Sequence, residues 1–346
     1  MSSFLHLDAH YYYYYSCVAL ILLGLGLLGQ ANAQMYRVDS NNKKLAYYTI
    51  TVDQSGHGNF TSIQSAIDAV PINNRNWVSI KIKAGTYKEK VIIPVDKPYI
   101  ILKGENRHKT QIVWDDHDSV AQSPTFASYA DSIIVKSISF VNSYNNPVNN
   151  KNPRVAAVAA MIYGDKSSFY RCGFFGLQDT LWDGQGRHYY HLCTIQGAVD
   201  FIFGSAQSIF QKCSIQVLGG ALDPGSAGYI TAQGRDNPND ASGFVFKDCK
   251  VSGTGSTFLG RAWRGYSRVI FYNSNFSQVV VPQGWDAWHF QGNEHQLTYA
   301  EHGCYGPGAD TVKRVEWEKK LNADTVRELT SLNFIDTDGW LNDQPF

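Results

Sequence analysis

The sequence predicts an all-β protein, a right-handed parallel β-helix with a short N-terminal capping helix and a C-terminal wrap. The main observation is a template that occurs five times: an aromatic residue, two variable residues, a small residue, one variable residue and an apolar residue. Its small positions, 21, 20, 36 and 25 residues apart, are Cys172, Cys193, Cys213, Cys249 and Ser274. A period of about 20 to 25 residues is typical of stacked coils, and the longer interval indicates an inserted surface loop.

Short strand-like runs precede the template. Runs of β-branched and apolar residues, separated by Gly, Asn and Asp, predict strands at residues 78–83, 91–93, 100–102 and 133–140. A β-sandwich or jelly roll would show strands at similar spacing, but it would not explain a repeated template. The two observations together favour the β-helix.

One amphipathic helix is predicted before these strands, at residues 61–70. Its apolar side chains recur at i, i+3, i+4 and i+7, as Ile63, Ala66, Ile67 and Val70. Thr61 or Ser62 can cap its start, and Pro71 ends it. We expect this helix to cover one open end of the β-helix core.

The C-terminal part, from about residue 280, is richer in Trp, Gly and charged residues. It is expected to wrap over the flank of the β-helix, with a short helix at residues 323–329. Because no linker separates it from the strands, residues 34–346 are predicted to form one domain.

Composition excludes some classes of function. The 346 residues include 30 basic and 30 acidic ones, which argues against a nucleic-acid-binding protein, since these normally have a basic excess. A hydrophobic content of 44% is enough for one large core. The aromatic content of 14% is compatible with a carbohydrate ligand, because flat rings pack against sugars.

The N-terminal residues 1–33 are predicted to be a signal peptide. Residues 17–29 are apolar, too short a run to span a bilayer and of the right length for a signal-peptide core. Cleavage is expected after Ala33, although five Tyr stand where a basic region is usual. The sequons at Asn59 and Asn275 agree with a secreted glycoprotein that has no membrane segment after cleavage.

Two copies of one phrase lie in the middle of the chain. Cys172-Gly-Phe-Phe-Gly-Leu-Gln-Asp179 is followed by Cys193-Thr-Ile-Gln-Gly-Ala-Val-Asp200, and the two Asp residues are 21 apart. If 21 residues make one coil, Asp179 and Asp200 are stacked. Their carboxylates then lie about 4.8 Å apart, the spacing of neighbouring strands.

Two carboxylates at that distance titrate as a coupled pair, in which one pKa rises. This division suits one ionised nucleophile or base and one protonated acid. The other interpretation is a polar ladder that only holds turns. Gln178 adds an amide donor, Arg261 adds a cation that can keep one carboxylate ionised, and Trp263 adds a flat ring on the same strand face.

These motifs resemble those of plant pectinesterases (pectin methylesterases). The matching segments are GTYKE (85–89), GLQDT (176–180), VDFIFG (199–204), TAQGR (231–235), LGRAW (259–263) and YSR (266–268). The similarity runs from about residue 47 to residue 341, and the family fold is a right-handed parallel β-helix. Because it begins soon after the apolar run, we expect the form without the inhibitor-like pro-region.

The resemblance implies a role for four residues. Asp200 would be the nucleophile that attacks the methyl-ester carbonyl of a galacturonate unit, and Asp179 the acid/base that protonates methanol and then activates water. Gln178 would stabilise the tetrahedral oxyanion. Arg261 would fix Asp200 in place. No metal or cofactor is implied.

The resemblance also implies substrate-binding and structural residues. Trp263 and Phe201 would line the sugar-binding cleft. Cys213 and Cys249 match a disulfide of the family, whereas Cys172 matches one member of a second bridge whose partner this chain lacks. An odd number of cysteines after the signal peptide leaves at least one free thiol, and the absence of C-x-x-C spacing disfavours a zinc site.

One departure from the family concerns the oxyanion hole. The family motif Gln-Ala-Val-Ala-Leu is AAVAA here (156–160), so Ala156 replaces a second oxyanion donor. Losing one such donor commonly costs about 100- to 1000-fold in turnover. We therefore expect an active but slow esterase. The change to Arg-Ala-Trp from Arg-Pro-Trp is smaller.

Other functions are less well supported. A polygalacturonase would use Asp115-Asp116 and the segment Gly56-His-Gly58, but these come in the wrong order, and inverting hydrolysis needs carboxylates about 6.5 to 9.5 Å apart. A pectate lyase needs an acidic calcium cluster, and a serine esterase needs G-x-S-x-G; neither is found. A non-catalytic wall-binding protein on the same fold, motivated by Ala156, remains the alternative.

The expected partner is pectin (methylated homogalacturonan), and a proteinaceous pectinesterase inhibitor is a further candidate. We expect no nucleic acid as partner, a monomer, and an extracellular location in the cell wall.

Overall fold

The computed structural model of the chain describes residues 48–146 and 152–345. The signal peptide predicted at residues 1–33 lies outside these residues. In the described part, no helix has both the length and the apolar character needed to cross a bilayer.

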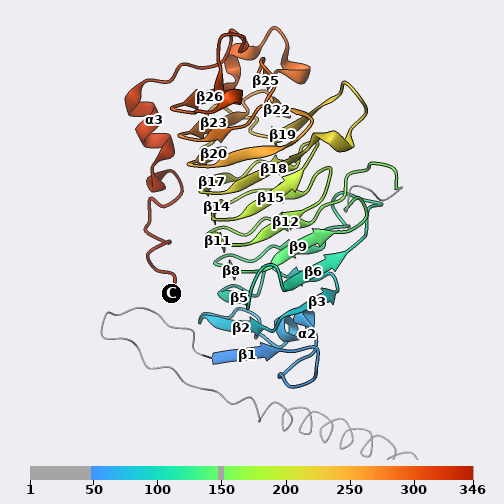
Figure 1. Cartoon of the computed structure of the whole chain (residues 1–346). Coiled ribbons are helices and arrows are strands. Elements are labelled where there is room, and N and C mark those ends of the chain that lie inside the picture. Colours follow the sequence, from blue (N-terminus) through green and yellow to red (C-terminus); the bar gives the residue numbers. More distant parts are fainter. Residues whose placement is uncertain (1–47, 147–151, 346) are drawn as a thin grey trace, which may run out of the picture. The chain divides into compact units, whose positions relative to one another are not determined.

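Three parallel sheets form the β-helix in the described residues (Figure 1). The first sheet contains ten strands, β1 (Tyr48–Val52), β2 (Val78–Ile82), β5 (Ile100–Gly104), β8 (Ile134–Lys136), β11 (Ser167–Tyr170), β14 (Arg187–His191), β17 (Gln207–Gln211), β20 (Gly243–Lys247), β23 (Arg268–Tyr272) and β26 (Thr298–His302). The second contains eight strands, β4 (Val91–Ile93), β7 (Phe126–Ser128), β10 (Ala160–Ile162), β13 (Leu181–Asp183), β16 (Ile202–Gly204), β19 (Ala227–Gln233), β22 (Ser256–Ala262) and β25 (Trp285–Asp286). The third contains eight strands, β3 (Gly85–Lys88), β6 (Thr110–Trp114), β9 (Ser139–Asn142), β12 (Gly173–Phe175), β15 (Thr194–Gly197), β18 (Ser214–Leu218), β21 (Lys250–Thr254) and β24 (Asn275–Phe276).

Each central coil contributes one strand to each sheet, so strands pair with their counterparts one coil away. For example, β11 pairs with β14, β12 with β15 and β13 with β16, all parallel. The predicted parallel β-helix is therefore confirmed.

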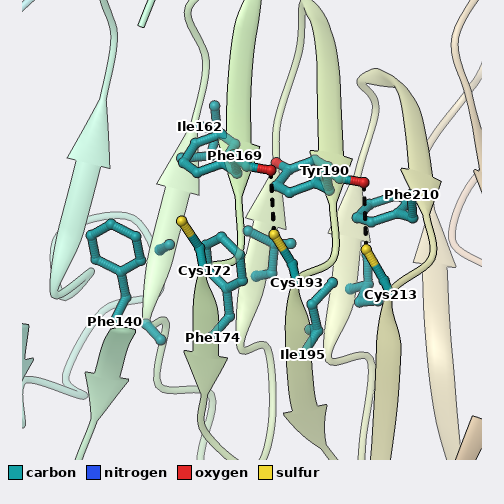
Figure 2. Packing of buried hydrophobic residues seen from close by; sticks show 14 of the residues in the cluster. Phe140, Ile162, Phe169, Cys172, Phe174, Tyr190, Cys193, Ile195, Phe210 and Cys213 are labelled. Carbon is teal, nitrogen blue, oxygen red and sulfur yellow. Dashed lines mark hydrogen bonds between the residues drawn. The ribbon is translucent and has the colours of Figure 1, made fainter. Parts of the chain in front are cut away.

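The repeated template forms a column of stacked rings inside the β-helix. Neighbouring ring centroids are 4.9, 4.6, 4.6 and 4.4 Å apart along Phe169, Tyr190, Phe210, Phe246 and Phe271. All five side chains are fully buried, and Figure 2 shows the first three in line. A ring at the same place in these five coils thus gives this part of the core a continuous, closely packed centre.

The template also marks the corner between the first and third sheets. The residue before each small position has a φ between 48° and 57°, in the left-handed region: Arg171, Leu192, Lys212, Asp248 and Asn273. Ser137, with φ of 57°, makes the same corner one coil earlier. It divides the run predicted at residues 133–140 into β8 and β9, because a left-handed residue bends the chain out of one sheet and into the next.

The predicted capping helix is present as α2 (Ile63–Asp68), with the Ser62 hydroxyl accepting a hydrogen bond from the Ser65 backbone N–H. Its predicted apolar face is buried in the core. The Glu89 carboxylate accepts the backbone N–H groups of Ile63 and Gln64 at 2.8 and 3.0 Å. A carboxylate at that end satisfies donors that the helix cannot pair itself.

The C-terminal segment covers the outer face of the first sheet, as predicted. Helix α3 (Ala323–Thr330) packs against β20 and runs beside the sheet in Figure 1. An apolar cluster joins sheet residues such as Ile209 and Val245 to Ile335 and Trp340 of the tail. Short 3₁₀ turns complete the described elements, at η2 (Gly219–Ala221), η3 (Trp288–Phe290), η4 (Glu294–Gln296), η5 (Pro307–Ala309) and η6 (Leu332–Phe334).

The disulfide predicted between Cys213 and Cys249 is not formed, so this prediction was wrong. Both residues are buried free thiols on neighbouring coils. Each thiol instead donates to a main-chain carbonyl of the preceding coil, Cys213 to Tyr190 at 3.4 Å and Cys249 to Phe210 at 3.1 Å. Figure 2 shows Cys172, Cys193 and Cys213 in one row beside the ring column.

Candidate active site

Asp179 and Asp200 occupy equivalent turns of successive coils, just before β13 and β16. The residues before them, Gln178 and Val199, form a parallel β-bridge, and the Asp179 backbone N–H donates to the Val199 carbonyl at 3.0 Å. Both Asp residues are in the left-handed region, with φ of 58° and 47°, which Asp tolerates better than most residues. The stack puts the two side chains about one strand spacing apart.

Asp200 is paired with Arg261 of β22. The Arg261 Nε donates to Asp200 Oδ1 at 2.8 Å, and Nη2 donates to Oδ2 at 2.5 Å. Asp200 is only 8% exposed. This two-point contact fixes the orientation of the carboxylate as well as its charge.

The two carboxyl groups differ in acidity. Burial, together with the negative charge of Asp200, raises the pKa of Asp179 to about 7, against the opposing influence of Arg261. Burial also raises the pKa of Asp200, but the hydrogen bonds and charge of Arg261 counteract that rise. Because Arg261 stabilises the charged form of Asp200, Asp200 is the member of the pair that loses its proton more readily, and Asp179 is the member that keeps one.

Gln178 lies beside this pair and is partly exposed. Its side-chain amide forms no hydrogen bond with the residues that the structure describes, so both of its N–H groups can reach a ligand oxygen. Ala156 forms the β-bridge with Gln178 from the preceding coil. Its methyl group stands in the position next to Gln178 and has no donor to add.

Phe201 does not line the site, so this prediction was wrong. Its side chain is fully buried in the main core cluster, because the chain turns at Asp200 and directs the next residue inward. Phe203, two residues further on, lies instead in a smaller cluster with Trp263 on the outside of the second sheet.

A row of aromatic side chains crosses the coils on this outer face. Ring centroids are 5.7 Å apart for Tyr163 and Trp182, 5.2 Å for Trp182 and Phe203, and 6.1 Å for Phe203 and Trp263. We call these four residues the aromatic row. Of these four, only Trp263 was predicted from the sequence, although Trp182 and Phe203 each follow an Asp of the repeated phrase by three residues.

Trp263 lies at one end of the aromatic row. A Cβ atom on Gly234 would come within 2.8 Å of its ring, so the ring packs directly on the glycine backbone. The guanidinium of the exposed Arg264 lies 5.6 Å from the ring centroid. The row therefore joins flat apolar faces to a positive charge, which suits an anionic sugar.

Two further aromatic residues contact Arg261, and neither belongs to a motif of the sequence. The Arg261 Cζ lies 4.2 Å from the ring centroid of Tyr229 and 3.8 Å from that of Trp288. Tyr229 follows the long insertion and Trp288 lies in the C-terminal part, outside the regular repeat.

The described residues contain no group of three or more His, Cys, Asp or Glu able to hold a metal ion.

The site fits a hydrolase that acts through an aspartate nucleophile, since one carboxylate is ion-paired and its neighbour keeps a proton. The aromatic row beside it fits a polysaccharide substrate. The chain belongs to the pectinesterase family, whose model matches residues 49–338.

Similar proteins support this assignment. The chain is 64% identical over 299 residues to probable pectinesterase 29 of Arabidopsis thaliana, covering 86% of this chain and 89% of that protein. Its structure is similar to that of a pectin methylesterase from carrot, with a TM-score of 0.78, 31% identity, and coverage of 86% of this chain and 96% of the other. A pectin methylesterase solved with a bound hexasaccharide shares the fold, with a TM-score of 0.73, 23% identity, and coverage of 84% and 97%.

Proposed function

We propose that this protein removes methyl esters from galacturonate units of cell-wall pectin, releasing methanol and acidic pectin. The observation that carries the proposal is the unequal carboxyl pair. Asp200 is held by Arg261, whereas burial and the charge of Asp200 raise the pKa of Asp179 to about 7. Family membership and the fold support the same activity.

In the first step, the ionised Asp200 attacks the ester carbonyl. A C–O bond forms between the Asp200 carboxylate and the carbonyl carbon, and the carbonyl oxygen becomes an oxyanion that the Gln178 amide stabilises. Collapse of this intermediate breaks the bond to the methoxy oxygen. Asp179 gives its proton to that oxygen, so methanol leaves and an acyl-enzyme anhydride remains.

In the second step, water hydrolyses the anhydride. The Asp179 carboxylate left by the first step takes a proton from water, and the resulting hydroxide attacks the acyl carbon. The bond to Asp200 breaks, and Asp179 keeps the proton that it took from water. The galacturonic acid that forms loses its own proton to solvent and leaves as the carboxylate. Arg261 stabilises Asp200 as the leaving carboxylate.

The aromatic row gives the substrate a surface to lie on. Phe203 follows Asp200 by three residues and Trp263 follows its partner Arg261 by two, and the flat faces of both rings can pack against sugar rings. Ala156 leaves Gln178 as the side-chain donor of the oxyanion hole, which predicts a slow enzyme rather than an inactive one. We retain a pectin-binding protein without turnover only as an outcome of the test.

The biological setting of the proposal follows the sequence. A signal peptide at residues 1–33 would direct a single catalytic domain, residues 34–346, to the cell wall as a monomer. A proteinaceous pectinesterase inhibitor is a candidate partner. Asn59 is exposed and could carry a glycan, whereas Asn275 is only partly exposed.

The test is methanol release from highly methylated pectin by the secreted protein. We expect slow release by the wild type and none above background by Asp200→Ala. A folded wild-type protein that binds pectin and releases no methanol would contradict the proposal and favour the binding alternative.

A further inference from the structure

Asp286 ties together the two rings that contact Arg261. Its Oδ2 accepts a hydrogen bond from the Tyr229 hydroxyl at 3.0 Å, and its Oδ1 accepts the backbone N–H of Trp288 at 2.8 Å. Asp286 also lies in register with Arg261, because β25 pairs with β22 at these two residues. We call Tyr229, Asp286 and Trp288 the arginine clamp.

The Trp288 end of the clamp depends on this carboxylate. Trp288 has a φ of 51°, a left-handed conformation that is unfavourable for a bulky residue. The hydrogen bond from its N–H to the side chain two residues earlier is the kind that supports such a turn. Without Asp286, the turn would lose the contact that holds the Trp288 ring against Arg261.

The Tyr229 end has a second support. The Tyr229 ring stacks on Phe258, with centroids 5.3 Å apart and planes 11° apart. Among the described residues, in contrast, Asp286 alone accepts a hydrogen bond from the Tyr229 hydroxyl. Removing the hydroxyl therefore weakens the clamp without removing the ring.

We propose that Asp286 is a positioning residue for ester hydrolysis, because it orients Arg261 through Tyr229 and Trp288 and so holds Asp200 ready for attack. This inference rests on the proposed function. A two-point contact between a guanidinium and a carboxylate requires the two planar groups to be aligned. A small misalignment at the nucleophile is costly in rate.

Two possible roles of Asp286 can be distinguished by the direction in which the pKa of Asp200 changes when Asp286 is removed. Charge interactions link Asp200 to Asp179, Arg261 and the buried Tyr299. They also link Arg261 to Tyr229 and Asp286. If Asp286 acted only through its negative charge, its removal would make Asp200 easier to ionise and lower its pKa. If it acts by aligning Arg261, its removal weakens the ion pair and raises the pKa of Asp200.

The experiment compares Asp286→Ala, Asp286→Asn and Tyr229→Phe with the wild type in the methanol assay across pH. For Asp286→Ala we expect kcat to fall about 10- to 100-fold with KM changed less than about threefold, and the acidic limb of kcat/KM to move to higher pH. Asp286→Asn keeps an oxygen for the Trp288 N–H and an amide for the Tyr229 oxygen, so it should restore most of kcat and leave the limb near its wild-type position. Tyr229→Phe should move the limb in the same direction as Asp286→Ala, by less.

The matched control is Asp310→Ala. Asp310 is exposed and accepts the Val312 backbone N–H at 3.0 Å, the same local hydrogen bond on a turn that does not contact Arg261. It should leave kcat and the pH profile unchanged. A limb that moves to lower pH in Asp286→Ala, an unchanged limb in both Asp286→Ala and Tyr229→Phe, or Asp286→Asn behaving like Asp286→Ala would each overturn the inference.

A second readout does not depend on turnover. The carboxyl titration of Asp200, followed by ¹³C NMR and assigned with Asp200→Asn, should shift to higher pH in Asp286→Ala. If the wild type releases no methanol, the proposed function fails; if it does release methanol and the Asp200 titration is the same in Asp286→Ala, the clamp inference alone fails. Should Asp286→Ala not fold, Tyr229→Phe carries the same comparison.

Discussion

The coils that end in Asp179 and Asp200 share one sequence phrase and one backbone conformation, and yet their carboxyl groups behave differently. Both Asp residues precede a short strand of the second sheet and have a left-handed φ. Only Asp200 receives Arg261, which comes from β22, two coils further along the sheet. A repeat can therefore duplicate a functional group, while a residue outside the repeated phrase gives each copy its role.

The strongest test of this division is an activated ester, such as a p-nitrophenyl ester of galacturonate. Asp200→Asn should lose the nucleophile and form no acyl-enzyme, so nitrophenol release should fall by at least about 10⁴-fold. Stopped-flow absorbance measures both the burst and the steady rate. A stoichiometric burst in Asp200→Asn would mean that Asp179, and not Asp200, is the nucleophile.

The corresponding change in the other coil should give a different result. A good leaving group needs no proton, so Asp179→Asn should release about one equivalent of nitrophenol and then stall as acyl-enzyme, because no base activates water. With methyl esters its turnover should fall about 10²- to 10⁴-fold. Intact-protein mass spectrometry would detect the adduct; equal loss of the burst in both variants would mean that the two carboxyls have no separate roles.

Ala156→Gln tests how many side-chain donors stabilise the oxyanion. A second amide next to Gln178 should raise kcat for methyl esters by about 10-fold or more, because one missing donor typically costs about 100- to 1000-fold when all else is optimal. Ala156→Leu, which fills similar space without a donor, is the control. An unchanged kcat in Ala156→Gln would show that another group already stabilises the oxyanion.

The smallest expected effect concerns pH and stability. Because the native pKa of Asp179 is raised to about 7, the native state binds its proton more tightly than the unfolded chain. The stability from this proton is complete below about pH 4 and is lost as the pH rises to about 7. Above pH 7 the native wild type must bury an ionised Asp179 carboxylate, which the uncharged amide of Asp179→Asn avoids. The variant should therefore raise the free energy of unfolding by about 1 to 3 kcal/mol at pH 8.

Urea unfolding of the wild type and Asp179→Asn at pH 5 and pH 8 measures this difference. The gain should be larger at pH 8 than at pH 5. The same group should limit catalysis, with kcat/KM falling about tenfold per pH unit above 7. A gain that is equal at both pH values would argue that Asp179 has an ordinary acidity.

Sequence reasoning succeeded where one coil repeats another. The template positions, the capping helix and the stacking of the two Asp turns all follow from the spacing of residue types, since parallel coils force equivalent residues into columns. The family resemblance was misleading at Phe201, because the left-handed turn at Asp200 directs that side chain into the core. The resemblance was also misleading at Cys213 and Cys249, since neighbouring coils bring the two thiols into one row without deciding whether they bond.

The arginine clamp could not be predicted for a different reason. Tyr229 follows an insertion of irregular length, and Asp286 and Trp288 lie where the template has ended. Their meeting depends on the register between β22 and β25, which no repeated phrase signals. Long-range contacts of this kind are visible only in the folded chain.

The parallel pairing of each coil with the next also sets the order in which the coils fold. Most strand contacts join residues about one coil apart in the sequence, so such a fold can grow by adding coils to those already formed. Asp200 would be in place two coils before Arg261 docks and three coils before Asp286 does. A chain that is still being completed therefore has its two carboxyls but lacks the cation that activates one of them, and its chemistry begins only when the later coils close over the site.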